Sequence, residues 1–132
     1  MRLVLCNGVF DLLHAGHVAH LREARSMGDY LIVGLTVDEH VNKRGRPIQT
    51  WEERAEMLRA LRSVNAVYRC RNAVEVIMAW GPNIFVKGGD YADKGLLKEE
   101  IEACEFVGAE IRHTAYVPIT TTDIVRRIKE AA

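Results

Sequence analysis

Several features are scarce in this chain of 132 residues, and each scarcity excludes a class of protein. There are three cysteines, and their odd count and wide spacing fit neither a zinc site nor a disulfide framework. Aromatic residues make up 7% of the chain and the formal net charge is zero, so the stacking surface and basic field of a nucleic-acid-binding module are not expected. No apolar run approaches transmembrane length, which argues against a membrane partner.

What is present indicates a globular protein. Apolar residues make up 48% of the chain and charged residues 27%, and this length suits one domain covering residues 1–132. The first residues, Met1-Arg2-Leu3, lack the layout of a signal peptide. We therefore expect a cytoplasmic protein with buried, reduced thiols at Cys6, Cys70 and Cys104.

Short apolar runs alternate with helical patterns along the whole chain. Such runs are typical of strands that are buried on both faces of a sheet. They lie at Leu3–Cys6, Tyr30–Thr36, Ala66–Cys70, Ile84–Lys87 and Glu110–His113. Capping residues and glycines predict helix starts at Thr50, Asn72 and Thr120, and helix ends near Met27, Gly81 and Gly108.

This alternation predicts an α/β fold with a single doubly wound, Rossmann-like sheet of five parallel strands and helices on both faces. Such a sheet binds its ligand beyond the carboxyl ends of the strands, at the switch point of the strand order. The loops that leave the first and fourth predicted strands, 7–17 and 87–90, are therefore expected to form the binding site.

The most specific pattern is the stretch Gly8-Val9-Phe10-Asp11-Leu12-Leu13-His14-Ala15-Gly16-His17. It lies where a predicted strand turns into a helix N-terminus, whose free N–H groups and dipole favour an anion such as a phosphate. His14 and His17 add donors for the charge that develops on a transferring phosphoryl group. The alternative is that both histidines only cap and pack the helix.

This stretch resembles the GxFDxxHxGH signature of the cytidylyltransferase-like nucleotidyltransferases, and the resemblance covers nearly the whole chain. It implies catalytic roles for His14, His17, Lys43 and Arg54. It implies nucleotide binding by Gly8, Phe10, Asp11, Gly16, Lys87, Gly89, Asp90, Thr120, Thr121 and Thr122. The resemblance also suggests a homodimer.

A basic loop, Lys43-Arg44-Gly45-Arg46-Pro47, follows the second predicted strand. Nucleotidyl transfer brings an anionic phosphate up to a triphosphate, so cations are needed to offset the repulsion and hold the leaving pyrophosphate. By composition, a loop whose charges are merely solvated is an equal alternative. Because of the resemblance, Lys43 is the expected catalytic cation, and Arg54 is expected to bind nucleotide phosphate. Arg54 also suits a surface ion pair with a neighbouring glutamate.

The run Lys87-Gly88-Gly89-Asp90-Tyr91 is the same as one in the ADP-heptose synthase branch of that family. The resemblance therefore favours ATP as nucleotide donor and a sugar 1-phosphate, such as a heptose 1-phosphate, as acceptor. Lys87 is expected to meet a phosphate, and Asp90 can accept hydrogen bonds from ribose hydroxyls. An ordinary Gly-Gly turn is the alternative.

Thr120, Thr121 and Thr122 begin the last predicted helix and match a phosphate-binding run of the family. The cytidylyltransferases place an arginine where this chain has Ala115, which counts against CTP. Two alternatives remain. One is a glycerol-3-phosphate cytidylyltransferase that makes CDP-glycerol from CTP, and the other is a nucleotide-binding protein without turnover.

Three roles are open to Asp11: it can orient a histidine, pair with Lys43, or help to hold Mg²⁺ through water. We expect Mg²⁺ together with ATP or CTP, held mainly by the substrate phosphates. His20 is expected to be a partly exposed helix residue, whereas His40 and His113 have no motif support.

Overall fold

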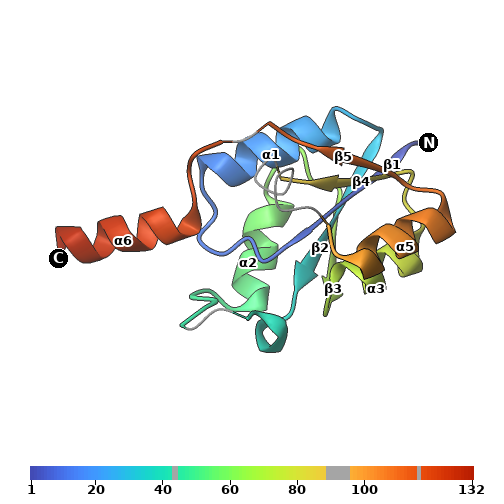
Figure 1. Ribbon diagram of the computed structural model, residues 1–132. Coiled ribbons are helices and arrows are strands. Elements are labelled where there is room, and N and C mark those ends of the chain that lie inside the picture. The colour runs from blue at the N-terminus through green and yellow to red at the C-terminus, as the bar shows by residue number, and fades with distance from the viewer. Residues whose placement is uncertain (43–44, 89–95, 116) are drawn as a thin grey trace.

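The computed structural model describes residues 1–42, 45–88, 96–115 and 117–132. Its strands form one parallel sheet in the order β3-β2-β1-β4-β5 (Figure 1). Their bounds are β1 Leu3–Gly8, β2 Tyr30–Thr36, β3 Ala66–Cys70, β4 Ile84–Lys87 and β5 Glu110–His113. The predicted doubly wound α/β fold is confirmed, and the strand order switches direction between β1 and β4.

Helices fill the crossovers between these strands. Their bounds are α1 Ala15–Arg25, the 3-10 helix η1 Asp38–His40, α2 Trp51–Arg59, α3 Ala73–Trp80, α5 Lys98–Val107 and α6 Thr121–Ala131. Thr50, Asn72 and Thr120 cap α2, α3 and α6, as the sequence predicts. The helices α3 and α5 end at the two predicted glycines, Gly81 and Gly108, in the left-handed conformation.

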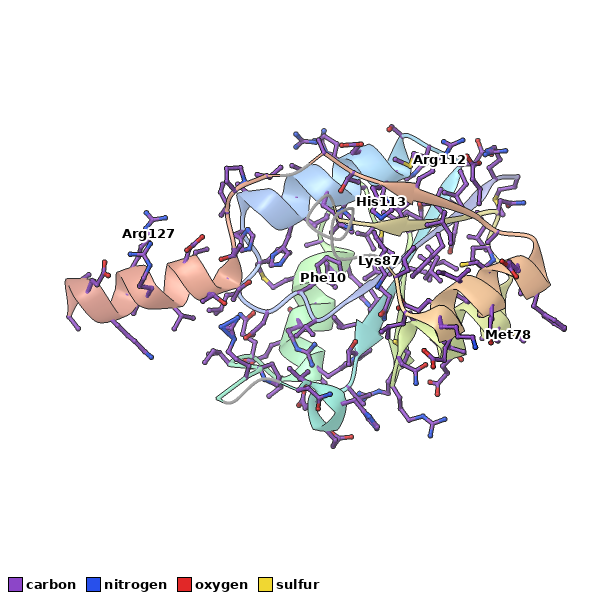
Figure 2. The ribbon with its side chains drawn as sticks, viewed as in Figure 1. Phe10, Met78, Lys87, Arg112, His113 and Arg127 are labelled. Atoms are coloured by element: carbon purple, nitrogen blue, oxygen red, sulfur yellow. The ribbon has the colours of Figure 1, made fainter. Side chains whose placement is uncertain are left out.

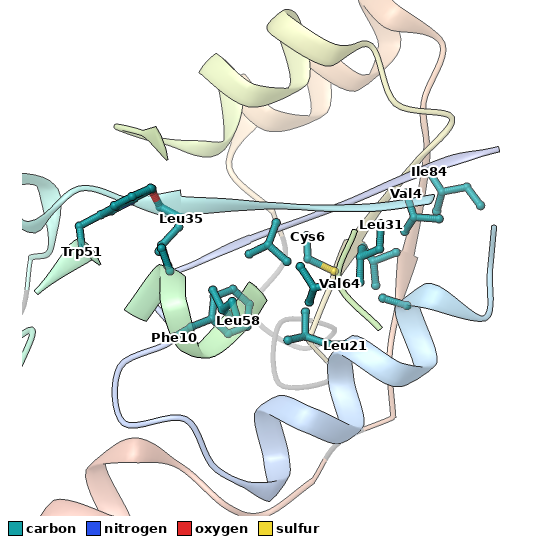
Figure 3. Packing of buried hydrophobic residues seen from close by; sticks show 14 of the residues in the cluster. Val4, Cys6, Phe10, Leu21, Leu31, Leu35, Trp51, Leu58, Val64 and Ile84 are labelled. Atoms are coloured by element: carbon teal, nitrogen blue, oxygen red, sulfur yellow. The ribbon is translucent and has the colours of Figure 1, made fainter. Parts of the chain in front are cut away.

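The sheet is buried on both faces, which explains why its strands read as continuous apolar runs. On one face, Val4 and Cys6 of β1 join a cluster with Leu21 of α1 and Leu58 of α2, shown in Figure 3. Leu5 points to the opposite face. There it joins a second cluster with residues of α3 and α5.

The three cysteines are free and buried, as expected. Burial raises the pKa of the Cys6 thiol to about 12, so this thiol stays protonated at neutral pH. Among the described residues, no helix combines the length and the apolar character that crossing a bilayer requires.

The last helix, α6, differs from the other α-helices because it has no buried residue and projects away from the sheet (Figure 1). Its first turn is tied to the rest of the chain, since Oγ1 of Thr121 donates a hydrogen bond to the backbone carbonyl of Asp11 at 2.8 Å. The N-terminus of α6 therefore lies beside the loop that follows β1.

Candidate active site

A cavity of ≈ 680 Å³ lies at the carboxyl ends of β1 and β4, at the predicted switch point. Its walls include the loop after β1, the first turns of α1, the end of β4 and the first turn of α6, together with Val41, Asn42, Arg46 and residues 114, 115, 117 and 119. Figure 2 labels Phe10 on the first of these walls and Lys87 on the third. The structure thus brings the predicted signature and the predicted threonine run to one site.

His14 is both the N-cap of α1 and a wall of the cavity. Its Nδ1 accepts a hydrogen bond from the backbone N–H of Gly16 at 3.0 Å. Burial lowers the pKa of His14, so the ring is neutral at pH 7 and carries its hydrogen on Nε2. This Nε2 atom is buried and has no hydrogen-bond partner within the described part of the chain.

His17 completes the cap from the opposite direction. Its Nδ1 accepts a hydrogen bond from the backbone N–H of His14 at 3.2 Å, and the two rings stack with centroids 3.8 Å apart. Burial, together with His14 and His20, lowers the pKa of His17 to about 3, although Asp11 opposes this shift. Both rings are therefore neutral donors. Their Nδ1 atoms accept hydrogen bonds from two of the backbone N–H groups that we had expected to bind a phosphate.

The titration of His17 makes stability depend on pH. The unfolded chain binds a proton below about pH 6.5, whereas the folded chain does not bind it until about pH 3, so this histidine costs stability as the pH falls between these values. We expect His17→Gln, which keeps a capping acceptor at this position, to remove part of that loss, up to about 1.4 kcal/mol per pH unit. Urea unfolding of the parent protein and of His17→Gln at pH 4.5 and pH 7.5 measures this loss of stability. An equal loss in both proteins would contradict the neutral state of the ring.

Phe10 shapes the floor between these histidines and the sheet. Its ring centroid lies 5.3 Å from that of His17, and its backbone has a positive φ of 49°. A Cβ at Gly8 would come within 2.8 Å of the Phe10 ring, so only glycine leaves room for it. Gly16 is constrained in the same way, because a Cβ there would lie 2.9 Å from the carbonyl oxygen of Ile119. These glycines therefore permit close packing around the histidines.

Asp11 has partners that the sequence did not predict, whereas its expected pairing with Lys43 lies outside the described residues. Its buried carboxylate accepts hydrogen bonds from the backbone N–H groups of Ile48 and Gln49, at 2.8 and 3.0 Å, and from Nε of Arg46 at 3.1 Å. The carboxylate thus fastens the far end of the basic loop to the signature. The described residues contain no group of three acidic, histidine or cysteine side chains able to hold a metal, so they do not form a magnesium cage.

Arg54 lies apart from the cavity, which differs from its expected contact with phosphate. Its side chain is 0% exposed, and its guanidinium donates to the backbone carbonyls of Val9, Thr36 and Gln49 and to the carboxylate of Asp38. The neighbouring glutamates made it look like a surface residue. Instead, its four hydrogen bonds link three segments of the chain, one of which belongs to the signature.

Lys87 lines the cavity but is paired inside the protein. Its Nζ lies 3.1 Å from Oε2 of Glu100 on α5, and both side chains are nearly buried. The other described cation at the cavity, Arg46, is paired with Asp11. Among the described residues, the groups that this cavity offers an anion are therefore mainly neutral N–H donors and helix N-termini. Lys43, Gly89 and Asp90 lie outside the described residues, so their roles stay predictions.

At the N-terminus of α6, Thr120, Thr121 and Thr122 all line the cavity, as the sequence predicts. The hydroxyl of Thr120 accepts the capping bond from the N–H of Asp123, and that of Thr121 is used on the carbonyl of Asp11. Sequence reasoning missed His20, which also lines the cavity. Its signal was the spacing of three residues that separates His14, the N-cap of α1, from His17 and His17 from His20.

Comparisons with known proteins show which family the chain resembles. The family model described as Cytidylyltransferase-like matches residues 5–127. The bifunctional protein HldE of Pelobacter propionicus is 38% identical over 98% of this chain and 27% of the relative. That of Koribacter versatilis is 39% identical over 96% of this chain and also 27% of the relative. The chain thus spans about a quarter of the length of these curated relatives.

Solved structures share the fold. A lipopolysaccharide core biosynthesis protein from Thermoplasma volcanium superposes with a TM-score of 0.74 at 24% identity, covering 89% of this chain and 98% of that one. TmcAL from Thermotoga maritima, bound with alpha-thio ATP, gives a TM-score of 0.73 at 16% identity, covering 99% of this chain and 51% of that one. At these identities the likeness concerns the arrangement of strands and helices.

Proposed function

Because this chain belongs to the cytidylyltransferase-like family of nucleotidyltransferases, we propose that it transfers the AMP group of ATP to a sugar 1-phosphate, such as a heptose 1-phosphate. The observation that carries the proposal is the pair of stacked, neutral imidazoles at the wall of the cavity, of which His14 has a buried, unpartnered Nε2 within the described residues. The similarity to HldE proteins and the Lys87-Gly88-Gly89-Asp90-Tyr91 run support the choice of ATP and a sugar phosphate.

In the proposed reaction, a phosphate oxygen of the acceptor attacks the α-phosphorus of ATP in line. The bond from the α-phosphorus to the bridging oxygen breaks, and pyrophosphate leaves. His14 and His17 donate hydrogen bonds to the oxygens on which negative charge grows. The N-terminus of α6 attracts the triphosphate, and Mg²⁺ enters with the nucleotide as part of the substrate. Protein side chains hold and orient the reactants and form no covalent intermediate.

Pyrophosphate release tests the proposal directly. The protein is incubated with Mg²⁺ and either ATP or CTP, each with D-glycero-heptose 1-phosphate or with glycerol 3-phosphate, and products are identified by mass spectrometry. We expect release only with ATP and the sugar phosphate. Release with CTP and glycerol 3-phosphate would instead establish the CDP-glycerol reaction. Nucleotide binding without release in any of the four mixtures would favour a non-catalytic protein.

A further inference from the structure

The position of the α6 N-terminus is not explained by the packing of α6, since that helix has no buried residue. Besides the hydrogen bond from Thr121 to Asp11, it depends on the β5–α6 connection, residues 114–120, of which residue 116 lies outside the described range. Figure 1 shows the described parts of this connection running alongside α1 between β5 and α6. The contacts between the connection and α1 therefore decide where Thr120, Thr121 and Thr122 meet a phosphate.

Two polar contacts join the beginning of the connection to α1. Nδ1 of His20 and Oγ1 of Thr114 share a hydrogen bond at 2.7 Å, and Thr114 is only 4% exposed. One turn further along α1, Oε1 of Glu23 accepts a hydrogen bond from the backbone N–H of Ala115 at 3.0 Å. The partners are more than 90 residues apart in the chain. These bonds therefore close a long loop of chain.

The end of the connection is also held at the start of α1. Gly16 approaches the carbonyl oxygen of Ile119 so closely that a Cβ would lie 2.9 Å from it. The hydroxyl of Thr121 donates to the carbonyl of Asp11, just before α1. The connection is thus hydrogen-bonded to α1 at its beginning and packs closely against the first turn of α1 at its end. A shift at either end changes the separation of the two helix N-termini that face the cavity.

We propose that His20 and Glu23 are positioning residues, which hold the β5–α6 connection against α1 and thereby set the distance between the N-termini of α1 and α6. They act through Thr114 and Ala115. A triphosphate that spans both helix ends loses affinity when one end moves, because both dipoles and both sets of donors must reach it together. The kinetic consequence rests on the proposed nucleotidyl transfer, whereas the structural consequence does not.

Three substitutions on α1 test the Glu23 contact. Glu23→Ala removes the acceptor, Glu23→Gln keeps an acceptor oxygen, and Arg22→Ala is the matched control because Arg22 is exposed on the same helix. Without nucleotide, we expect Glu23→Ala to speed amide hydrogen exchange across residues 115–122, while the other two variants match the parent protein. We expect the KM for the nucleotide to rise about fivefold with little change in kcat, as one lost hydrogen bond implies.

The Thr114 contact has its own matched pair. Thr114→Val removes the hydroxyl at nearly constant volume, and Thr114→Ser retains it. We expect faster exchange across residues 115–122 and a higher KM in the valine variant, with the serine variant close to the parent protein. Adding Glu23→Ala to Thr114→Val is expected to raise KM further than either change alone.

The outcomes separate this inference from the proposed function. Unchanged exchange across residues 115–122 in both Glu23→Ala and Thr114→Val would overturn the inference, whether or not the protein turns over a nucleotide. If the parent protein releases no pyrophosphate, the proposed function fails, and the exchange measurement alone decides the positioning role. A lower melting temperature in Glu23→Ala with unchanged exchange and KM would show a contribution to stability only and would also overturn it.

Discussion

The His14→Asn variant is expected to lose about 10²- to 10³-fold in kcat, the usual cost of removing one donor that stabilises developing charge. Asparagine is a favoured N-cap, so its side chain can still accept the bond from the N–H of Gly16. It is too short to replace Nε2 of the imidazole. The substitution therefore separates the two functions of His14, capping α1 and donating to a substrate.

Steady-state kinetics and thermal unfolding together check this expectation. We expect His14→Asn to lose kcat while its unfolding temperature stays near that of the parent protein. His14→Ala removes both functions, so it should also lose about 1 kcal/mol of stability through the missing cap. His40→Asn is the matched control, because His40 is exposed and does not line the cavity. Retention of full kcat in His14→Asn would limit this histidine to capping.

Arg54→Met is expected to lower the free energy of unfolding by about 3–5 kcal/mol, because each buried acceptor left without its hydrogen bond costs about 1–3 kcal/mol. Methionine has a similar length but no donors, so the carbonyls of Val9, Thr36 and Gln49 would lose the bonds that satisfy them. The largest effect is therefore expected on stability, although the family resemblance assigned Arg54 to phosphate.

Urea unfolding measures this loss, and Arg62→Met is the control because Arg62 is an exposed arginine just after α2. The KM for the nucleotide, measured where the variant is still folded, tests the alternative. We expect KM to change much less than stability. A variant with normal stability and a KM raised tenfold or more would show that Arg54 binds phosphate directly. It would also show that Arg54 becomes accessible when the nucleotide binds.

The fold was predictable to within a few residues, because its signals are local. A strand that is covered on both sides must be apolar throughout, and the capping residues Thr50, Asn72 and Thr120 mark helix starts by bonds within a single turn. The signature from Gly8 to His17 is continuous, so its place at a strand-to-helix turn could also be predicted. The expected homodimer stays a prediction, which light scattering can test.

The environment of Arg54 was not predictable, because its partners come from distant segments that converge only in the fold. The carbonyl of Val9 is 45 residues away in the chain and that of Thr36 is 18 residues away. The pairing of Lys87 with Glu100 has the same origin, since a lysine at a strand end resembles a phosphate ligand until α5 packs beside it. The residues next to Arg54 and Lys87 in the sequence therefore do not predict these contacts.

The sequence by itself determined the strand and helix pattern, the family and the two helix starts that face the cavity, since each depends on residues close together in the chain. Only the tertiary structure decided how the polar groups are used. In the folded chain His14 and His17 are neutral and cap α1. Asp11 is hydrogen-bonded to the end of the basic loop, and Thr114 is hydrogen-bonded to His20. The reason is physical: burial and long-range hydrogen bonds set a group's charge state and direction, and both exist only after the chain has folded.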